Sequence, residues 1–204
     1  MKELEIKRIL IKWLLKRPEF GSIIGSEYRF DFGARRADVV TIHEDGNACA
    51  FEIKGIGDSL RALRYQCEGY KLYFDRCFVV CERENLHLVR REIPKDIGII
   101  VIEENIFLQL RKSKEFKKLD KIMLCSTIDT GFMRRNIKHH KLSKFDTCKE
   151  FINNNKYEDI KLISRSFLRQ RIETRFQIFL KEIGQEISYD DLATLDRMPS
   201  LQIF

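Results

Sequence analysis

The sequence lacks any long, uninterrupted apolar segment. Its first twenty residues are partly apolar but are interrupted by basic side chains at Lys7, Arg8, Lys12, Lys16 and Arg17. A membrane-spanning helix needs about 20 consecutive, mainly apolar residues, and a secretory signal needs an unbroken apolar centre. We therefore expect no signal peptide, no membrane span, no membrane partner and a cytoplasmic location.

Closely paired cysteines are absent as well. The six cysteines are scattered, mostly within apolar runs, and no second pair lies near Cys77 and Cys81 to complete a zinc site. We expect reduced, buried thiols. The sequence also contains no glycine-rich phosphate loop, no dinucleotide-binding fingerprint and no serine or cysteine nucleophile motif. These absences argue against an NTP-driven motor and against a triad-type hydrolase.

Positive charge is concentrated in one part of the chain, whose formal net charge is +7. Residues 105–149 contain 12 Lys+Arg and 4 Asp+Glu, a balance of +8, whereas residues 1–104 are neutral overall and residues 150–204 sum to −1. Localised positive charge suits a phosphate backbone, because each neutralised phosphate releases condensed counterions. We expect nucleic-acid contact here. A lysine-rich surface that only faces water would give the same pattern.

The apolar pattern divides the chain into a mixed α/β half and a helical half. A length of 204 residues allows one domain, or a core with an extension. We place the boundary at residue 104, with a core over 1–104 and a helical extension over 105–204. The core is predicted to contain helices over 2–16, 60–74 (capped by Asp58 and Ser59) and 85–91, and strands within 21–33 and over 36–42, 48–54, 77–81 and 97–102. The extension is predicted to contain helices around 106–119, 148–154, 160–183 and 190–195.

The segment 48–55 carries the strongest chemical signal. It is an apolar strand in which Glu52 and Lys54 stand two residues apart. Side chains alternate along a strand, so these two must share a face while Phe51 and Ile53 point into the core. A buried acid and base are costly unless they pair or bind something. We therefore expect a binding site on this face.

The preceding strand adds a second carboxylate, Asp38. A two-residue turn at the hairpin would place Asp38 opposite Ile53, inside the core. A three-residue turn, with residue 44 opposite residue 48, would place it opposite Lys54. Burying an unpaired carboxylate costs several kcal/mol, so we predict the second register, or a bulge of the same parity, with Asp38, Glu52 and Lys54 on one face.

Two carboxylates and a lysine on adjacent strands suit a divalent cation. Mg²⁺ prefers oxygen ligands and keeps several waters, so Asp38 and Glu52 would suffice, and the carbonyl of Ile53 could add a ligand. Lys54 would then position or deprotonate a water, or stabilise charge on a phosphate. A plain ion pair between Lys54 and Asp38 explains the same residues.

At this point the sequence resembles a known group of proteins. The residues that carry the match are Glu27, Arg36-Ala37-Asp38 and Phe51-Glu52-Ile53-Lys54. They resemble the motif of the PD-(D/E)XK nuclease superfamily, with Ala37 where the proline usually stands. The continuation over 58–61, Gln66, Tyr70 and 93–100 is similar to the sce7726 family of bacterial and phage proteins. The match covers residues 20–104 well and residues 105–204 only vaguely.

The resemblance implies a restriction-endonuclease-like core, that is, a mixed sheet flanked by helices, and a metal-dependent nuclease that uses Mg²⁺ or Mn²⁺. Asp38 and Glu52 would be the metal ligands, with Glu27 as an additional ligand directly or through water; Asp31 lies close enough to compete for that role. Lys54 would be the catalytic lysine. Gln66 would reach the site from the next helix. It lies on the apolar face of that helix, where a polar amide needs a hydrogen-bond partner.

The helical half would supply the contacts to nucleic acid, for which we expect DNA. Four basic residues, Arg134, Arg135, Lys138 and Lys141, would form a stripe if a helix continued through them. A homodimer is compatible with such an enzyme, because two sites can then cut two strands. Two alternatives stay open. One is a nuclease-like fold that binds nucleic acid or protein without turnover, and the other is a basic surface for an acidic partner in a phage or bacterial defence assembly.

Overall fold

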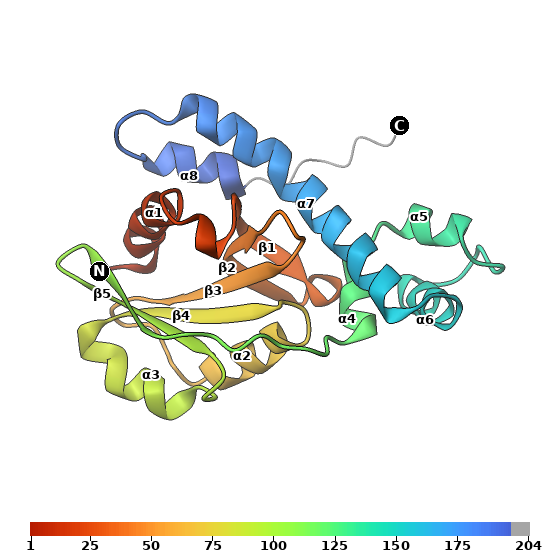
Figure 1. The fold of residues 1–204 in the computed structure, drawn as a ribbon, viewed down its shortest axis with the longest axis horizontal. Coiled ribbons are helices and arrows are strands. Elements are labelled where there is room, and N and C mark those ends of the chain that lie inside the picture. Colours follow the sequence, from red (N-terminus) through yellow and green to blue (C-terminus); the bar gives the residue numbers. More distant parts are fainter. Residues whose placement is uncertain (197–204) are drawn as a thin grey trace.

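The computed structural model describes residues 1–196. Its centre is a six-stranded mixed sheet with the strands in sequence order, helices on both faces and further helices beyond one end (Figure 1). The strands are β1 (Ile23–Phe30), β2 (Arg35–Ile42), β3 (Ala48–Lys54), β4 (Arg76–Glu82), β5 (Gly98–Glu103) and β6 (Ile106–Arg111). This confirms the predicted fold class, an α/β core followed by a helical C-terminal region.

The direction of the strands changes twice across the sheet. Strands β1, β2 and β3 form an antiparallel meander, β3, β4 and β5 run parallel, and β6 returns antiparallel to β5. Parallel neighbours need a crossover, which is provided by the helices α2 (Leu63–Lys71) and α3 (Leu86–Glu92). Strand β3 therefore lies between two neighbours and is buried along its whole length, as its nearly continuous apolar sequence requires.

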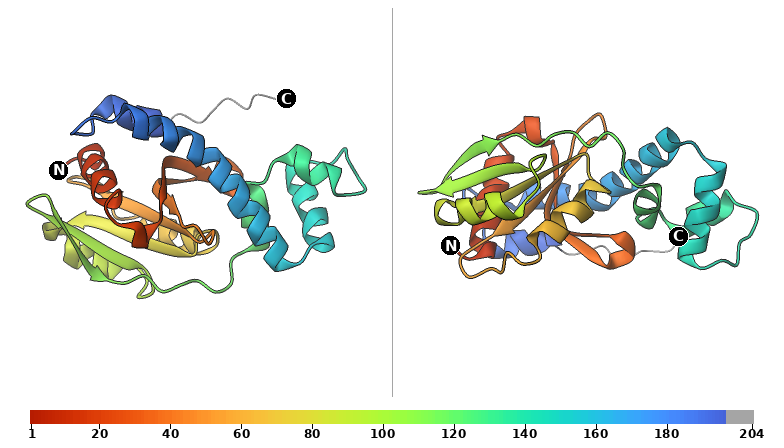
Figure 2. Two further views of the ribbon diagram at one scale, coloured as in Figure 1. Left: turned by 45° about the horizontal axis from the view of Figure 1, so that its top comes forward. Right: turned by 90° about the horizontal axis from the view of Figure 1, so that it is seen from below.

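Helix α1 (Glu3–Leu14) covers the face of the sheet opposite to α2 and α3 (Figures 1 and 2). Its apolar side chains follow helical spacing, and Ile6, Leu10, Ile11 and Leu14 are buried. One charged side chain on this helix, that of Lys7, is buried among them. A buried ammonium requires a partner, which the sheet supplies from β1.

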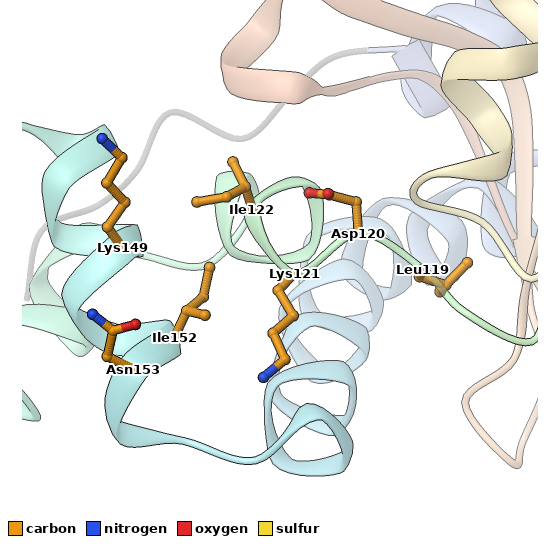
Figure 3. A pocket seen from close by; sticks show the side chains of 7 residues that line it. All are labelled: Leu119, Asp120, Lys121, Ile122, Lys149, Ile152 and Asn153. Carbon is orange, nitrogen blue, oxygen red and sulfur yellow. The ribbon is translucent and has the colours of Figure 1, made fainter.

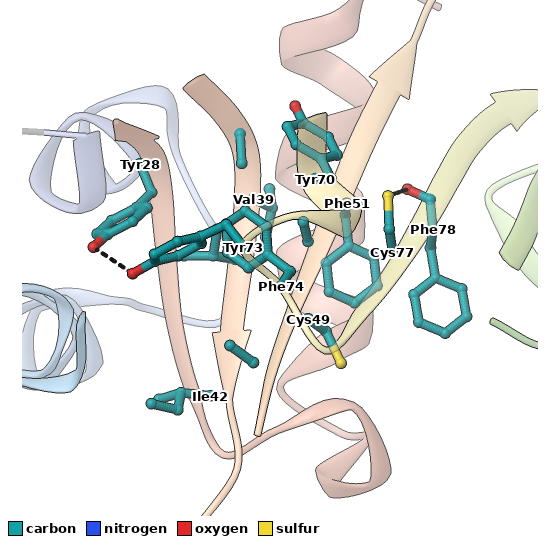
Figure 4. Close-up of a cluster of buried hydrophobic side chains, with 14 of the residues drawn as sticks. Tyr28, Val39, Ile42, Cys49, Phe51, Tyr70, Tyr73, Phe74, Cys77 and Phe78 are labelled. Atoms are coloured by element: carbon teal, nitrogen blue, oxygen red, sulfur yellow. Dashed lines mark hydrogen bonds between the residues drawn. The ribbon is translucent and has the colours of Figure 1, made fainter. Parts of the chain in front are cut away.

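An aromatic cluster holds the β1–β2 hairpin against α2 (Figure 4). The ring of Phe30 stacks on that of Tyr73 at 5.3 Å, and the hydroxyl oxygens of Tyr28 and Tyr73 are 3.2 Å apart. The Tyr73 hydroxyl also lies 3.0 Å from Thr127 Oγ1. Buried aromatic hydroxyls normally find such partners. The cluster thereby fixes the hairpin, the helix after β3 and the start of the C-terminal region relative to one another.

The C-terminal region consists of α4 (Lys121–Ser126), α5 (Thr130–Arg135), α6 (Lys144–Asn154), α7 (Tyr157–Glu182) and α8 (Tyr189–Asp196). Helices α4 to α6 lie beyond one end of the sheet, and the long α7 runs from them back across β1 to α8 (Figures 1 and 2). A buried ion pair anchors α7, since Arg165 Nη2 lies 3.0 Å from Asp75 Oδ2 just before β4. No helix within residues 1–196 has the length and apolar character needed to cross a membrane.

Most predicted elements occur within a few residues of their expected positions, and 48–54 matches β3 at both ends. All six cysteines are free and buried, as expected. The helix predicted around 106–119 is wrong: β6 occupies its first part and extends the sheet beyond residue 104. Apolar residues at 106, 107, 108 and 110 fit both the periodicity of a helix and that of a strand. In the structure this segment pairs with β5 and forms a strand. The strand buries Phe107 and exposes Ile106, Leu108 and Leu110.

Two further predictions were wrong. Asp58 and Ser59 do not cap α2, which begins later, at Leu63; Asp58 instead accepts a hydrogen bond from the Gly55 amide at 2.7 Å. The basic stripe does not form either, because α5 ends at Arg135 and residues 136–143 form turns. Within 136–143 the only apolar residues are Ile137 and Leu142, which are five positions apart and form no apolar face that could extend the helix.

Candidate functional site

The acid and base of β3 contact each other. Lys54 Nζ donates a hydrogen bond to Glu52 Oε1 at 2.7 Å, and both side chains are buried. The other carboxylate oxygen, Glu52 Oε2, accepts a hydrogen bond from the hydroxyl of Tyr70 on α2. Strand alternation and the crossover helix thus place an acid, a base and a phenol together in a site that is almost closed to water, with Glu52 only 1% exposed.

Asp38 enters the site from β2. Its Oδ2 accepts a hydrogen bond from the Ile53 amide at 2.7 Å. This amide lies beyond the last backbone pair of β2 and β3, Val39 with Phe51, so a side chain takes the place of a backbone acceptor there. The backbone pairing runs from Ile42 opposite Ala48 to Val39 opposite Phe51. Continued by one residue, this register brings Asp38 level with Glu52. Asp38 therefore lies on the same face of the sheet as Glu52 and Lys54, as predicted. Its predicted partner is wrong, because Asp38 is level with Glu52 and not with Lys54, which is two residues further along β3.

Glu27 reaches the same place from β1. Its carboxylate accepts a hydrogen bond from Lys7 of α1, and Arg36 Nε lies 2.6 Å from its second oxygen. Glu27 has a positive φ of 52°, an uncommon backbone conformation for a residue with a side chain. Asp31, which competed with Glu27 in the sequence, pairs with Arg35 instead, at 3.0 Å.

Glu3, at the start of α1, is a member of the cluster that the sequence did not reveal. Glu3, Glu27 and Asp38 each offer a carboxylate oxygen within 4.8 Å of the others, an arrangement that could hold a metal ion. In the sequence, Glu3 is an ordinary acidic residue in the first turn of a helix. Its proximity to β1 and β2 depends on how α1 packs on the sheet, which no local pattern encodes.

The cluster contains more acid than base. Its charged side chains are Glu3, Glu27, Asp38, Glu52, Lys7, Arg36 and Lys54. Burial, followed by the charge of Glu52, raises the pKa of Asp38 well above its usual range. Burial lowers the pKa of Lys54, but Glu52 and Asp38 outweigh it, so its pKa lies above the ordinary value. Four carboxyl groups share three cations, and the raised pKa of Asp38 reflects burial and this crowding, which a bound divalent cation would relieve.

Gln66 supplies an acceptor without a partner. Its Oε1 is buried and accepts no hydrogen bond from any of the described residues. It lies one helical turn before Tyr70, which contacts Glu52, so α2 presents both toward the same part of the sheet. A buried amide oxygen normally has a partner, and a metal-bound water or a substrate group would provide one.

The donor set fits a hard cation such as Mg²⁺ or Mn²⁺. All its candidate atoms are oxygens, and Asp38 Oδ1 makes no hydrogen bond within residues 1–196. Both oxygens of Glu52 already accept one hydrogen bond each, from Lys54 and Tyr70, which leaves one lone pair on each. Ile53 takes part through its amide, and its carbonyl as a ligand stays a prediction.

The four basic residues predicted to bind nucleic acid differ in whether their side chains are held by other parts of the protein. Arg134 is held in place, since its Nη2 donates a hydrogen bond to the Leu142 carbonyl at 2.7 Å. Arg135, Lys138 and Lys141 are exposed and form no ion pair with the described part of the chain. They lie at the end of α5 and in the turns after it. Three of the four can therefore contact a phosphate without first breaking an internal contact.

The fold and the site define an α/β protein that carries a partly buried acidic cluster and a lysine beside the central strand of its mixed sheet. The sequence family described as Bacteriophage P4 protein cII matches residues 1–196, and the chain belongs to this family. Protein cII of Enterobacteria phage P4 is 27% identical over 216 residues, which cover 97% of this chain and 78% of that protein. A solved structure of a protein of unknown function from Silicibacter pomeroyi aligns with 79% of this chain and 83% of its own, at 16% identity and a TM-score of 0.39. That similarity is too low to support a functional argument.

Proposed function

We propose that this protein is a metal-dependent nuclease that hydrolyses phosphodiester bonds, with DNA as its substrate. The observation that carries the proposal is the proximity of Asp38, Glu52 and Lys54, from β2 and β3. The unpartnered Gln66 lies one helical turn before Tyr70, which contacts Glu52. These are the residues on which the sequence resembles the PD-(D/E)XK superfamily and the sce7726 family. Their meeting in one buried cluster supports that assignment.

In this proposal Asp38 and Glu52 hold Mg²⁺ or Mn²⁺, and Glu27 contributes directly or through a water. A bound divalent cation supplies a Lewis acid for the phosphoryl oxygens and lowers the pKa of a coordinated water. Lys54, which is held beside Glu52, orients the attacking water or stabilises the charge that grows on the phosphate. Gln66 orients a water or a substrate group through its free carbonyl oxygen.

The basic segment would hold the substrate. Residues 105–149 carry a balance of +8, and the exposed Arg135, Lys138 and Lys141 lie within it. Contacts of this kind position a phosphate backbone without reading its sequence. Arg134 would act indirectly, by fixing the turn through its contact to Leu142. A homodimer that cuts two strands stays a prediction.

The direct test is cleavage. Purified protein is incubated with plasmid and oligonucleotide DNA in Mg²⁺, Mn²⁺ or EDTA, and compared with Lys54→Ala. Lys95→Ala is the matched control, because Lys95 is exposed and forms no ion pair within residues 1–196. We expect metal-dependent cleavage that Lys54→Ala abolishes and Lys95→Ala retains. A protein that cuts neither DNA nor RNA with either metal would overturn the proposal.

One observation favours a second function, that of a nuclease fold used only for binding within a phage or bacterial defence assembly. Both oxygens of Glu52 are engaged by groups of the protein itself, Lys54 and Tyr70. A carboxylate satisfied in this way can serve the structure alone. Calorimetry with Mg²⁺ and Mn²⁺ separates the two functions, since a binding scaffold would show no metal affinity while Glu52→Gln still bound DNA.

A further inference from the structure

Two aromatic rings are exposed together at the boundary between the sheet and the C-terminal helices. Phe32 lies in the turn between β1 and β2, and Phe145 lies in the first turn of α6. Their ring centroids are 5.7 Å apart in an edge-on arrangement. Phe32 is 39% exposed and Phe145 45% exposed, so the contact covers only part of each ring. The remaining ring surface faces water.

Lysine side chains accompany both rings. Lys144 Nζ lies 6.0 Å from the centre of the Phe32 ring, and Lys149 Nζ lies 4.4 Å from that of Phe145. We call these four residues the aromatic–basic cluster. Lys149 also has a loose ion pair with Asp146, at 3.9 Å. Basic side chains next to exposed ring faces are the composition of sites that bind nucleic-acid strands through both bases and phosphates.

The backbone holds Phe32 in its exposed position. Asp31 and Phe32 both have positive φ, 51° and 55°, which is an outlier for a bulky aromatic residue. The turn is fixed from two sides, because the Asp31 amide donates to Ser126 Oγ of α4 at 3.1 Å and Arg35 pairs with the Asp31 carboxylate. Such conformations persist only where surrounding contacts determine them, and they occur often at ligand sites.

Two cations at the cluster lack an acidic partner within residues 1–196. Lys144 and Arg171 form no ion pair with any other residue in the range 1–196. Burial, followed by the charge of Arg171, lowers the pKa of Lys144. A phosphate between them would offset both positive charges. An anionic ligand is therefore the natural complement of this surface.

A hollow continues the surface beyond Lys149, between α4 and α6 (Figure 3). It has a volume of about 420 Å³, within the usual range for small-ligand sites, and Lys149 forms part of its wall. Ile122 and Ile152 give it apolar sides, and Asn153 and Lys121 add an amide and a second ammonium. Asp120 also lines it, and its carboxylate accepts a hydrogen bond from the Met123 amide of α4. Apolar walls with an amide suit a base, and the two lysines suit its phosphate.

We propose that the aromatic–basic cluster and the adjoining hollow bind single-stranded nucleic acid, with bases stacked on Phe32 and Phe145 and phosphates held by Lys144, Lys149 and Arg171. A single strand is required because in a duplex the base faces are covered by their neighbours, so they cannot stack on a protein ring. The binding site depends on the proposed nuclease function in one respect only, which is that the bound strand would be delivered to Asp38. Arg35, at the end of the turn, is separated from Asp38 by three residues of extended β2, a distance of about 10 Å.

The test measures binding without cleavage. Fluorescence anisotropy in EDTA compares a labelled 20-nucleotide single strand, a duplex of the same length and an abasic strand with the same phosphates. We expect the single strand to bind most tightly. Phe145→Ala and Phe32→Ala should each weaken single-strand binding by roughly 5- to 150-fold, the range that corresponds to base–aromatic stacking, and leave abasic binding unchanged.

Three controls make the result specific. Tyr189→Ala removes an exposed aromatic residue outside the cluster and should change nothing. Phe145→Tyr keeps the ring and should retain binding. Phe32→Gly removes the ring at a position where glycine relieves the backbone strain, so a loss of binding there cannot come from misfolding.

The outcomes that overturn the proposal are equally distinct. Equal losses on the single strand, the duplex and the abasic strand would mean contact with phosphates alone. No binding to any nucleic acid at low salt, with binding to an acidic protein, would mean a protein-docking surface. The nuclease proposal fails separately, because a protein that never cleaves DNA could still bind the single strand through Phe145.

Discussion

The hydroxyl of Tyr70 donates a hydrogen bond to Glu52, so the helix that follows β3 completes the site that β3 begins. The same hydroxyl lies 2.9 Å from the Arg36 carbonyl oxygen of β2. One side chain therefore links the second strand, the third strand and α2. Burial, followed by the charge of Glu52, raises the pKa of Tyr70 well above its usual range, so the phenol stays protonated and acts as a donor.

Tyr70→Phe tests this link. The substitution removes a buried donor to a charged group and leaves Glu52 with one hydrogen bond fewer, a change worth about 1.5–3 kcal/mol. We expect the free energy of unfolding in urea to fall by that amount. Tyr65→Phe, on the same helix but 65% exposed, is the matched control and should leave stability unchanged. Equal effects of the two substitutions would contradict the role assigned to Tyr70.

Asp75 gives the fold a defined dependence on pH. Burial raises the pKa of this carboxyl, but Arg165, Lys161 and the Ala48 amide outweigh it, so its pKa lies below the ordinary value. A carboxyl of this kind stabilises the fold fully above its ordinary pKa of about 4, and the stabilisation is lost progressively as the pH falls from that value through the lower pKa of the folded state. Acid should therefore loosen the attachment of α7 to the sheet.

The measurement compares Asp75→Asn with the parent chain in urea at pH 7 and at pH 3. At pH 7 the substitution leaves Arg165 buried beside a neutral group, and we expect a loss of about 3–5 kcal/mol, as for other broken buried pairs. At pH 3 the difference should become smaller, because below the ordinary pKa the carboxyl binds a proton in the unfolded chain more readily than in the folded one, so part of its stabilisation is lost. A difference independent of pH would show that the hydrogen bonds of Asp75, not its charge, hold α7.

The sequence was sufficient to predict the central hairpin but not its register. Apolar runs and turn residues place β3 within 48–54 and put Glu52 beside Lys54, because strand alternation is a local property. The register depends on the turn. Residues 44–46 form it, with the His43 amide bonded to the Asn47 carbonyl and Gly46 at a φ of 83°. A three-residue hairpin favours glycine at its last position, so Gly46 was the signal that would have corrected the prediction.

The members of the cluster that were not predicted come from distant parts of the chain. Glu3 and Lys7 join it through the packing of α1. Glu27 was named from the resemblance, but its backbone has a positive φ that the sequence does not reveal. Strand β6 was missed because an almost uniformly apolar run fits both periods. Local patterns thus identified the residues of β2, β3 and α2, whereas contacts between elements decided what joins them.

Gly46→Ala tests the hairpin turn. An added Cβ would meet Arg165 Cβ at 3.8 Å, an ordinary contact, so the expected loss comes from the backbone alone and is about 1 kcal/mol. Gly184→Ala is the control, because its added Cβ meets nothing within 4 Å and its φ lies outside the left-handed region. Urea unfolding of both variants is the measurement. A neutral Gly46→Ala would mean that the turn adopts another conformation in solution.

Glu3→Gln tests whether the acidic cluster binds a cation. The substitution keeps the shape of the side chain and removes one carboxylate from the group that it forms with Glu27 and Asp38. We expect the affinity for Mn²⁺, measured by calorimetry, to fall about 10-fold or more, as when a supporting group of a metal site is lost. Glu5→Gln is the matched control, since Glu5 lies in the same first turn of α1 and has no ion pair within residues 1–196. Because both variants lose the same charge at the same helix end, equal effects would mean that general electrostatics, and not a ligand at Glu3, attracts the ion.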